Sequence, residues 1–86
     1  MLKYLIENYI NNMTINDVIM FSEKENIYLS EDEYLKIFNA IKEDWKDFIL
    51  DENLVKKYLD NSFNQEKSIK IYKLFLKYQK KYSSYL

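Results

Sequence analysis

The chain contains no cysteine, histidine, glycine or proline, and all thirteen of its basic residues are lysine. Without cysteine or histidine it has no disulfide bonds and lacks the thiolate and imidazole ligands of zinc sites. Without glycine it cannot form the glycine-rich loops that cradle phosphate groups. Without arginine it lacks the planar donor group that holds phosphate or guanine through two parallel hydrogen bonds. These absences exclude much of the common metal, thiol and nucleotide chemistry.

Long hydrophobic runs are also missing. The longest unbroken apolar stretch, Val18 to Phe21, has four residues, whereas a membrane-spanning helix needs about twenty. The polar residues from Glu7 to Asn12 argue against a secretory signal peptide. We therefore expect a cytoplasmic protein with no membrane contact, no metal and no cofactor.

Lysine, asparagine, isoleucine and tyrosine are used heavily, which is typical of a bacterial protein from an AT-rich genome. The 86 residues predict a single helical domain spanning residues 1–86. Because glycine is absent, we expect asparagine, the next most tolerant residue, at helix ends with left-handed backbone. Asn12, Asn26 and Asn61 stand where such ends are expected.

The stretch from Ser30 to Phe48 has the clearest helical pattern. Ser30 and Glu33 have the spacing of a capping box, in which each side chain bonds the other residue's backbone amide. The apolar residues that follow cover an arc of roughly 160°, which is too broad for one neighbouring helix. We predict a central helix over about residues 31–46. Trp45 should be largely buried against the C-terminal helix.

Four further helices are predicted, over about residues 2–12, 15–25, 52–60 and 65–83. Thr14, Asp51 and Asn64 are the expected caps of the last three. Phe48, Ile49 and Leu50 have no helical phase, and we interpret them as a buried turn. No stretch alternates apolar and polar residues for long, which argues against strands. The predicted fold class is all-α, either a compact five-helix bundle or an orthogonal helical domain.

Several of these positions resemble a known family. Thr14–Asp17–Val18, Tyr28–Leu29–Ser30, the helix containing Phe38 and Ile41, and Leu74–Phe75 occur in the order seen in the YqfT-like family. This family consists of short, helical, functionally uncharacterised proteins of low-GC Gram-positive bacteria. The resemblance covers roughly residues 13–80 and implies a helical fold without established catalytic residues. The tyrosine-rich end of this chain departs from the family pattern.

Charge is distributed unevenly along the chain. Residues 1–66 hold all fourteen acidic residues and seven lysines, a net charge of −7, whereas residues 67–86 hold six lysines and no acid, a net charge of +6. Such asymmetry indicates an interaction surface. It also allows head-to-tail self-association.

The C-terminal helix combines three side-chain strips. A main apolar seam, which we expect to be core, contains Ile71, Leu74, Phe75, Tyr78, Tyr82 and Tyr85. A second apolar strip of Ile69, Tyr72 and Leu76 lies beside the lysines. We predict a protein-interaction module whose partner binds Lys70, Tyr72, Lys73, Leu76, Lys77 and Lys80, and an acidic protein is the candidate partner. The alternative is weak, sequence-independent RNA or ribosome binding through the same lysines. A solvated face with scattered apolar residues explains the same pattern without a partner.

Two other functions receive less support. Asp44, Asp47 and Asp51 could share a helical face and bind a hard cation in a hydrolase, but a solvated acidic face explains them as well. Residues 15–46 could also form a DNA-binding helix-turn-helix. Its second helix would then present carboxylates at Glu31 and Asp32 to the phosphates, which repel them. We therefore expect neither an enzyme nor a DNA-binding protein.

Overall fold

Five helices follow one another in the computed structural model, which describes the backbone of residues 2–83 and the side chains of residues 4–80. They are α1 (Leu2–Asn12), α2 (Ile15–Lys24), α3 (Glu31–Leu50), α4 (Glu52–Ser62) and α5 (Gln65–Ser83). No strand occurs among the residues described. The protein thus has the predicted all-α, five-helix architecture.

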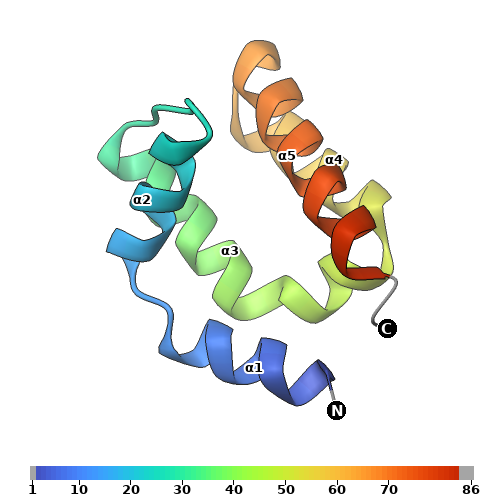
Figure 1. Ribbon diagram of the computed structural model, residues 1–86. Coiled ribbons are helices and arrows are strands. Elements are labelled where there is room, and N and C mark those ends of the chain that lie inside the picture. Colours follow the sequence, from blue (N-terminus) through green and yellow to red (C-terminus); the bar gives the residue numbers. More distant parts are fainter. Residues whose placement is uncertain (1, 84–86) are drawn as a thin grey trace.

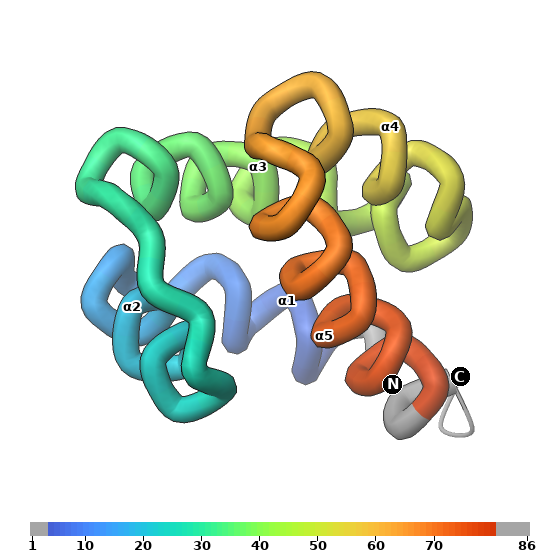
Figure 2. Tube along the Cα trace, turned by 90° about the horizontal axis from the view of Figure 1, so that it is seen from above, coloured from blue at the N-terminus to red at the C-terminus, as the bar shows by residue number. Residues whose placement is uncertain are grey.

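Helix α3 is the longest element and the one around which the others are placed (Figure 1). Helix α2 packs on it from one side, the α4–α5 hairpin from another, and α1 crosses the opposite side. Figure 2 shows the backbones of α2 and α5 on the same side of α3. The radius of gyration of 12.4 Å is close to the value of about 12 Å expected for a compact chain of this length.

The predicted helix starts are confirmed. Thr14 and Asp17 form a complete capping box at α2, and Ser30 and Glu33 form another at α3. Asp51 accepts a bond from the Asn53 amide at the start of α4. Asn64 accepts one from the Lys67 amide at 2.8 Å at the start of α5. Each of these bonds satisfies a helix-terminal N–H that has no partner within the helix.

The end of α2 has the predicted left-handed asparagine. Asn26 has φ 61°. The Ile27 amide donates to the Ser22 carbonyl at 2.9 Å, and this bond closes a six-residue turn at the end of the helix. Ile27 is buried, as expected for the residue after such a stop. Asn26 is the only described residue with positive φ. The predictions for Asn12 and Asn61 were therefore wrong, because those helix ends stay in ordinary backbone regions.

The central helix continues four residues beyond its predicted end, to Leu50. Phe48, Ile49 and Leu50 form its last turn and are not a buried turn between helices. Phe48 and Ile49 are half-buried, but Leu50 is 84% exposed. The chain breaks at Asp51, which is extended and caps both α3 and α4. The apolar run was misread because its three side chains point in different directions from one helix.

Helix α1 is fastened to α3 by a lysine. The Lys42 ammonium donates to the Ile10 carbonyl and, at 3.0 Å, to the Asn11 carbonyl. These carbonyls belong to the last turn of α1, where a positive charge also complements the helix dipole. Ile10 is the buried apolar residue of this contact.

The densest part of the core lies between α4 and α5. Val55, Leu59 and Phe63 form a buried cluster, and half-buried apolar side chains of α3 and α5 pack against it: Ile37, Phe48, Ile71, Tyr72 and Phe75. Ser68 is also buried there and donates to an Asp60 carboxylate oxygen at 2.6 Å. The Ser68 hydroxyl is therefore paired although it is buried.

Trp45 is placed differently from the prediction. It is half-buried and lies outside the Val55–Leu59–Phe63 cluster. The main neighbours of α3 are α1, α2 and α4, and Trp45 lies one turn after Lys42, which reaches α1. The helix face that packs on the core cluster of α4 is that of Ile37 and Phe48. The sequence correctly identified the apolar arc of α3. It did not show which neighbouring helix covers each part of that arc.

Among the described residues, no helix combines the length and the apolar character required to cross a lipid bilayer. The predicted core residues Tyr82 and Tyr85 lie outside the residues whose side chains are described.

Candidate functional site

The predicted lysines lie along one side of α5. Lys70, Lys73, Lys77 and Lys80 are all exposed, and we call them the lysine ridge. Their spacings of three and four residues keep them on one side of the helix. The opposite side carries the residues that pack on α4 and the core.

The two apolar residues predicted to share this surface are not equally available. Tyr72 packs against the Val55–Leu59–Phe63 cluster, and Leu76 is half-buried. Only Ile69 of the second apolar strip remains open, at 46% exposure. The strip is covered because α4 and α5 make the most extensive helix contact of the molecule. Tyr72 and Leu76 are both half-buried and are therefore less open to a partner than the four lysines. The predicted partner surface as a whole stays a prediction.

Lys70 and Lys77 of the ridge pair with carboxylates of the described residues. Lys70 lies 3.3 Å from Glu66 within α5, and Lys77 lies 3.6 Å from Glu25, the C-cap of α2. The Lys70 and Glu66 side chains are 54% and 79% exposed, whereas the Glu25 side chain is only 21% exposed. Exposed pairs contribute about 0–1 kcal/mol, so an incoming anion can replace Glu66 at Lys70 at small cost.

A shallow groove runs between the ridge and the end of α2. Its walls are Lys70, Lys73, Leu74 and Lys77 on one side and Glu25, Asn26 and Ile27 on the other. The sequence analysis missed the α2 side of this groove. Forty or more residues separate the two walls, and no local pattern signals such a contact.

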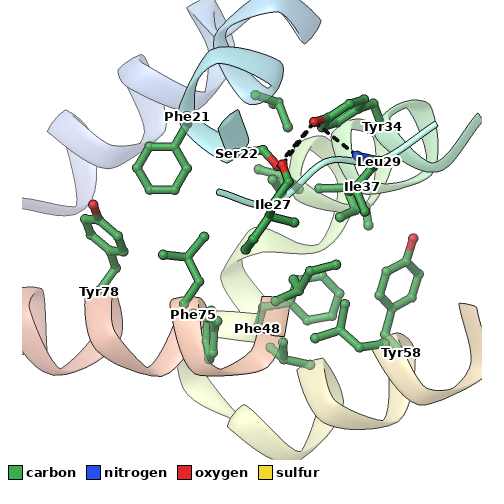
Figure 3. A pocket seen from close by; sticks show the side chains of 17 residues that line it. Phe21, Ser22, Ile27, Leu29, Tyr34, Ile37, Phe48, Tyr58, Phe75 and Tyr78 are labelled. Carbon is green, nitrogen blue, oxygen red and sulfur yellow. Dashed lines mark hydrogen bonds between the residues drawn. The ribbon is translucent and has the colours of Figure 1, made fainter. Parts of the chain in front are cut away.

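A second, apolar cavity lies deeper, between α2, α3, α4 and α5. Its volume is about 270 Å³. Figure 3 shows side chains from the α2–α3 side and from α4 and α5 pointing toward one another across it. The lining is Val18, Phe21, Ser22, Ile27, Leu29, Tyr34, Ile37, Ala40, Ile41, Phe48, Val55, Tyr58, Leu59, Ile71, Leu74, Phe75 and Tyr78. None of these residues is charged.

The polar atoms at the cavity wall are already paired with one another. The Tyr34 hydroxyl lies 3.3 Å from the Ser22 hydroxyl and 3.3 Å from the Ile27 carbonyl. It also accepts a bond from the Leu29 amide at 3.3 Å. Ser22 in turn donates to the Ile27 carbonyl. A buried water typically makes about three hydrogen bonds. Because these polar atoms are already paired, water in the cavity would find few partners.

The cavity is not sealed and is open to solvent on one side. Its apolar walls are therefore partly in contact with water, and an apolar group that filled the space would remove that surface from water, which is favourable by about 25 cal/mol per Å².

Helices α2 and α5 meet at one edge of the cavity. The rings of Phe21 and Tyr78 lie 5.0 Å apart in a tilted arrangement (Figure 3). The Tyr78 hydroxyl donates to Glu25 at 3.1 Å, and Lys77 pairs with the same carboxylate. Ile27 and Leu74 line both the cavity and the groove beside the ridge. The apolar and cationic sites are thus neighbours.

The carboxylates considered for catalysis do not form a metal site. Within the described part of the chain, no three acidic residues are grouped so that they could hold a metal ion. Asp44 and Asp47 are exposed on α3, while Asp51 is used as a cap. The cation site proposed for Asp44, Asp47 and Asp51 is therefore not formed in this structure.

Among the described residues, Glu33 and Tyr58 have shifted pKa values, and neither shift moves the group toward neutral pH. Hydrogen bonds from Lys67 and from Ser30 lower the pKa of Glu33 to about 2. Burial raises the pKa of Tyr58 above its ordinary value of 10.0, and the charge of Asp44 raises it further. General acids and bases work best with pKa values near the working pH, so these residues are suited to structural roles.

No protein family, curated protein or solved structure matches this chain. The resemblance to the YqfT-like family therefore stays a prediction.

Proposed function

We propose that the protein is a non-enzymatic interaction module that binds an acidic protein segment through the lysine ridge. The observation that carries this proposal is the exposure of Lys70, Lys73, Lys77 and Lys80 along one side of α5. They belong to a segment, residues 67–86, that contains no acidic residue. A row of positive charge beside a shallow groove attracts a chain of negative charge and sets its direction.

RNA binding through the same ridge receives less support. Proteins that bind single strands combine cationic grooves with aromatic side chains on which bases stack. Phe75, the aromatic residue at the middle of the ridge in sequence, and Tyr72 both pack against the core cluster. The net charge of −7 on residues 1–66 also opposes a polyanion as long as RNA. A short acidic protein segment meets less of that repulsion.

DNA binding and catalysis are not part of the proposal. Glu31 and Asp32 are exposed at the start of α3, where a recognition helix would meet phosphates. We also propose that the protein acts in the cytoplasm.

Fluorescence anisotropy with a labelled glutamate-rich peptide tests the proposal. We expect binding at about 0.05 M salt that weakens strongly at about 0.5 M, because exposed charges are screened. Lys73→Glu/Lys77→Glu should weaken binding by about tenfold or more, a loss of about 1.4 kcal/mol. The control is Lys56→Glu/Lys57→Glu, which makes the same charge change at exposed positions of α4.

Two results would contradict the proposal. One is equal loss of binding in the ridge and control variants, which would show a response to net charge alone. The other is tighter binding of single-stranded RNA than of the acidic peptide at the same salt, which would favour the alternative function.

Self-association is tested separately. The acidic end of α3, with Glu43, Asp44 and Asp47 exposed, could face the ridge of a second copy. Sedimentation at low and high salt distinguishes the cases. A salt-sensitive dimer would make a second copy the acidic partner, and a monomer under both conditions leaves the partner a different protein.

A further inference from the structure

We infer that the apolar cavity and the neighbouring lysines form one binding site for a single-chain carboxylate of the fatty-acid type. The hydrocarbon chain would occupy the cavity, and the carboxylate would lie in the groove at Lys73 and Lys77. This inference is independent of the acidic-partner proposal, although both use ridge lysines. It is carried by the shared wall, since Ile27 and Leu74 line the apolar cavity and the cationic groove together.

The lining determines the chemistry of the buried part of the ligand. No charged side chain lines the cavity. The hydroxyls of Ser22 and Tyr34 are engaged with each other and with the backbone of Ile27. A polar ligand group placed there would lose its water without gaining a partner. Hydrocarbon loses nothing in this environment.

The volume determines the approximate length of the chain. An apolar cavity of about 150 Å³ accommodates benzene, which has six carbons. Scaled in proportion, the 270 Å³ available here corresponds to about ten or eleven aromatic carbons, and to fewer of the bulkier methylene groups. A carboxylate of about ten to twelve carbons therefore fills the space with the far end of its chain, and its remaining carbons extend toward the groove.

The groove determines the charge of the exposed end. Lys70, Lys73 and Lys77 line it, and Glu25 is its only acidic residue. Within the described residues, Glu25 pairs with Lys77 at 3.6 Å, and no carboxylate lies within ion-pair distance of Lys73. A ligand carboxylate between Lys73 and Lys77 would take a position like that of Glu25. Phe21 and Tyr78, in ring contact at 5.0 Å, form the wall of the cavity at the edge where α2 and α5 meet.

Isothermal titration calorimetry with dodecanoate, kept below its micelle-forming concentration, tests the inference on the full chain. We expect one saturable site. 1-Decanol, which lacks the charge, should bind about tenfold or more weakly than decanoate, which has the same number of carbons, and butanoate, which lacks the chain, should not bind measurably. Equal binding of decanol and decanoate would overturn the role of the lysines. Absence of dodecanoate binding would overturn the site.

Two kinds of variant separate the two halves of the site. Ala40→Leu adds volume at a buried lining position and keeps a strong helix former in α3. It should abolish dodecanoate binding and leave the melting temperature unchanged or raised. A lowered melting temperature would show an already filled core, since overpacking destabilises, and would contradict the cavity.

Lys73→Gln/Lys77→Gln should weaken dodecanoate by about tenfold and leave decanol unchanged, whereas Lys56→Gln/Lys57→Gln should change neither. Equal weakening in both double variants would remove the assigned head-group site. Ala40→Leu also distinguishes this inference from the proposed function, because it should leave the acidic peptide's affinity intact. If the acidic peptide fails to bind any form of the protein while dodecanoate binds the wild type, the proposed function is contradicted. The fatty-acid site is then retained.

Discussion

At the scale of single residues, Glu33 has two structural roles. One of its carboxylate oxygens accepts the Ser30 amide in the capping box at 2.9 Å. The same group pairs with Lys67 of α5 at 2.8 Å, with the side chains only 34% and 18% exposed. The pair joins the start of the central helix to the start of the last one. Lys67 is therefore a structural residue, unlike the lysines of the ridge.

The low pKa of Glu33 predicts how this pair responds to acid. Its folded-state pKa of about 2 lies below the ordinary value of 4.5. The stabilisation is therefore fully present above about pH 4.5 and is lost as the pH falls toward 2. Glu33→Gln keeps a side chain suited to the capping box and removes the charge. It should lower the free energy of unfolding by about 1 kcal/mol at pH 7.

Urea unfolding at several pH values checks this expectation. The difference between wild type and Glu33→Gln should narrow as the pH falls from about 4.5 toward 2, because the Glu33 carboxylate of the unfolded chain takes up a proton in this range before that of the folded chain does. A difference that stays constant over this range would show that the ion pair contributes nothing.

At the scale of helices, the turn after α2 depends on one residue. Asn26 has φ 61°, a conformation that costs other residues with a Cβ about 1–2 kcal/mol. Asn26→Ala should therefore destabilise the protein by about 1 kcal/mol, and Asn26→Gly should be neutral or slightly stabilising. Asn61→Ala is the control, because Asn61 lies within α4 without positive φ. Thermal unfolding measures all three. A neutral Asn26→Ala would contradict the left-handed turn.

Two leucines of the α3–α4 region provide a second comparison. Leu59 is 2% exposed in the core cluster, whereas Leu50 is 84% exposed at the end of α3. Leu59→Ala should cost about 2–5 kcal/mol, and Leu50→Ala less than about 0.5 kcal/mol. Chemical denaturation measures both. Similar costs would mean that residues 48–50 are buried as the sequence first indicated.

The helices themselves could be predicted from sequence because their signals are local. Ser30, Thr14, Asp51 and Asn64 each act on amides within three residues of them. The end of α3 could not be predicted, since Phe48 to Leu50 lack the periodic pattern that marks a helix. Only the extended backbone at Asp51 ends it.

At the scale of the whole molecule, the contacts between distant helices were the unpredictable part. The sequence indicated that α3 has several neighbours but not which of them covers Trp45. It identified the ridge lysines as exposed. It did not reveal that Tyr72 packs in the core or that Ile27 and Leu74 connect a groove to a cavity. These arrangements depend on how α2 and α5 approach each other across α3, and nothing within either helix specifies that approach.

The most direct test of the central claim is nuclear magnetic resonance of the isotope-labelled protein titrated with a glutamate-rich peptide at low salt. The account predicts that the backbone amides at Lys70, Lys73 and Lys77, together with those at Glu25 and Asn26 across the groove, shift most. The amides at Lys56 and Lys57 should stay in place and so provide the internal control. Largest shifts on α1 or at Lys56 and Lys57, or small shifts spread evenly over the chain, would contradict binding at the lysine ridge.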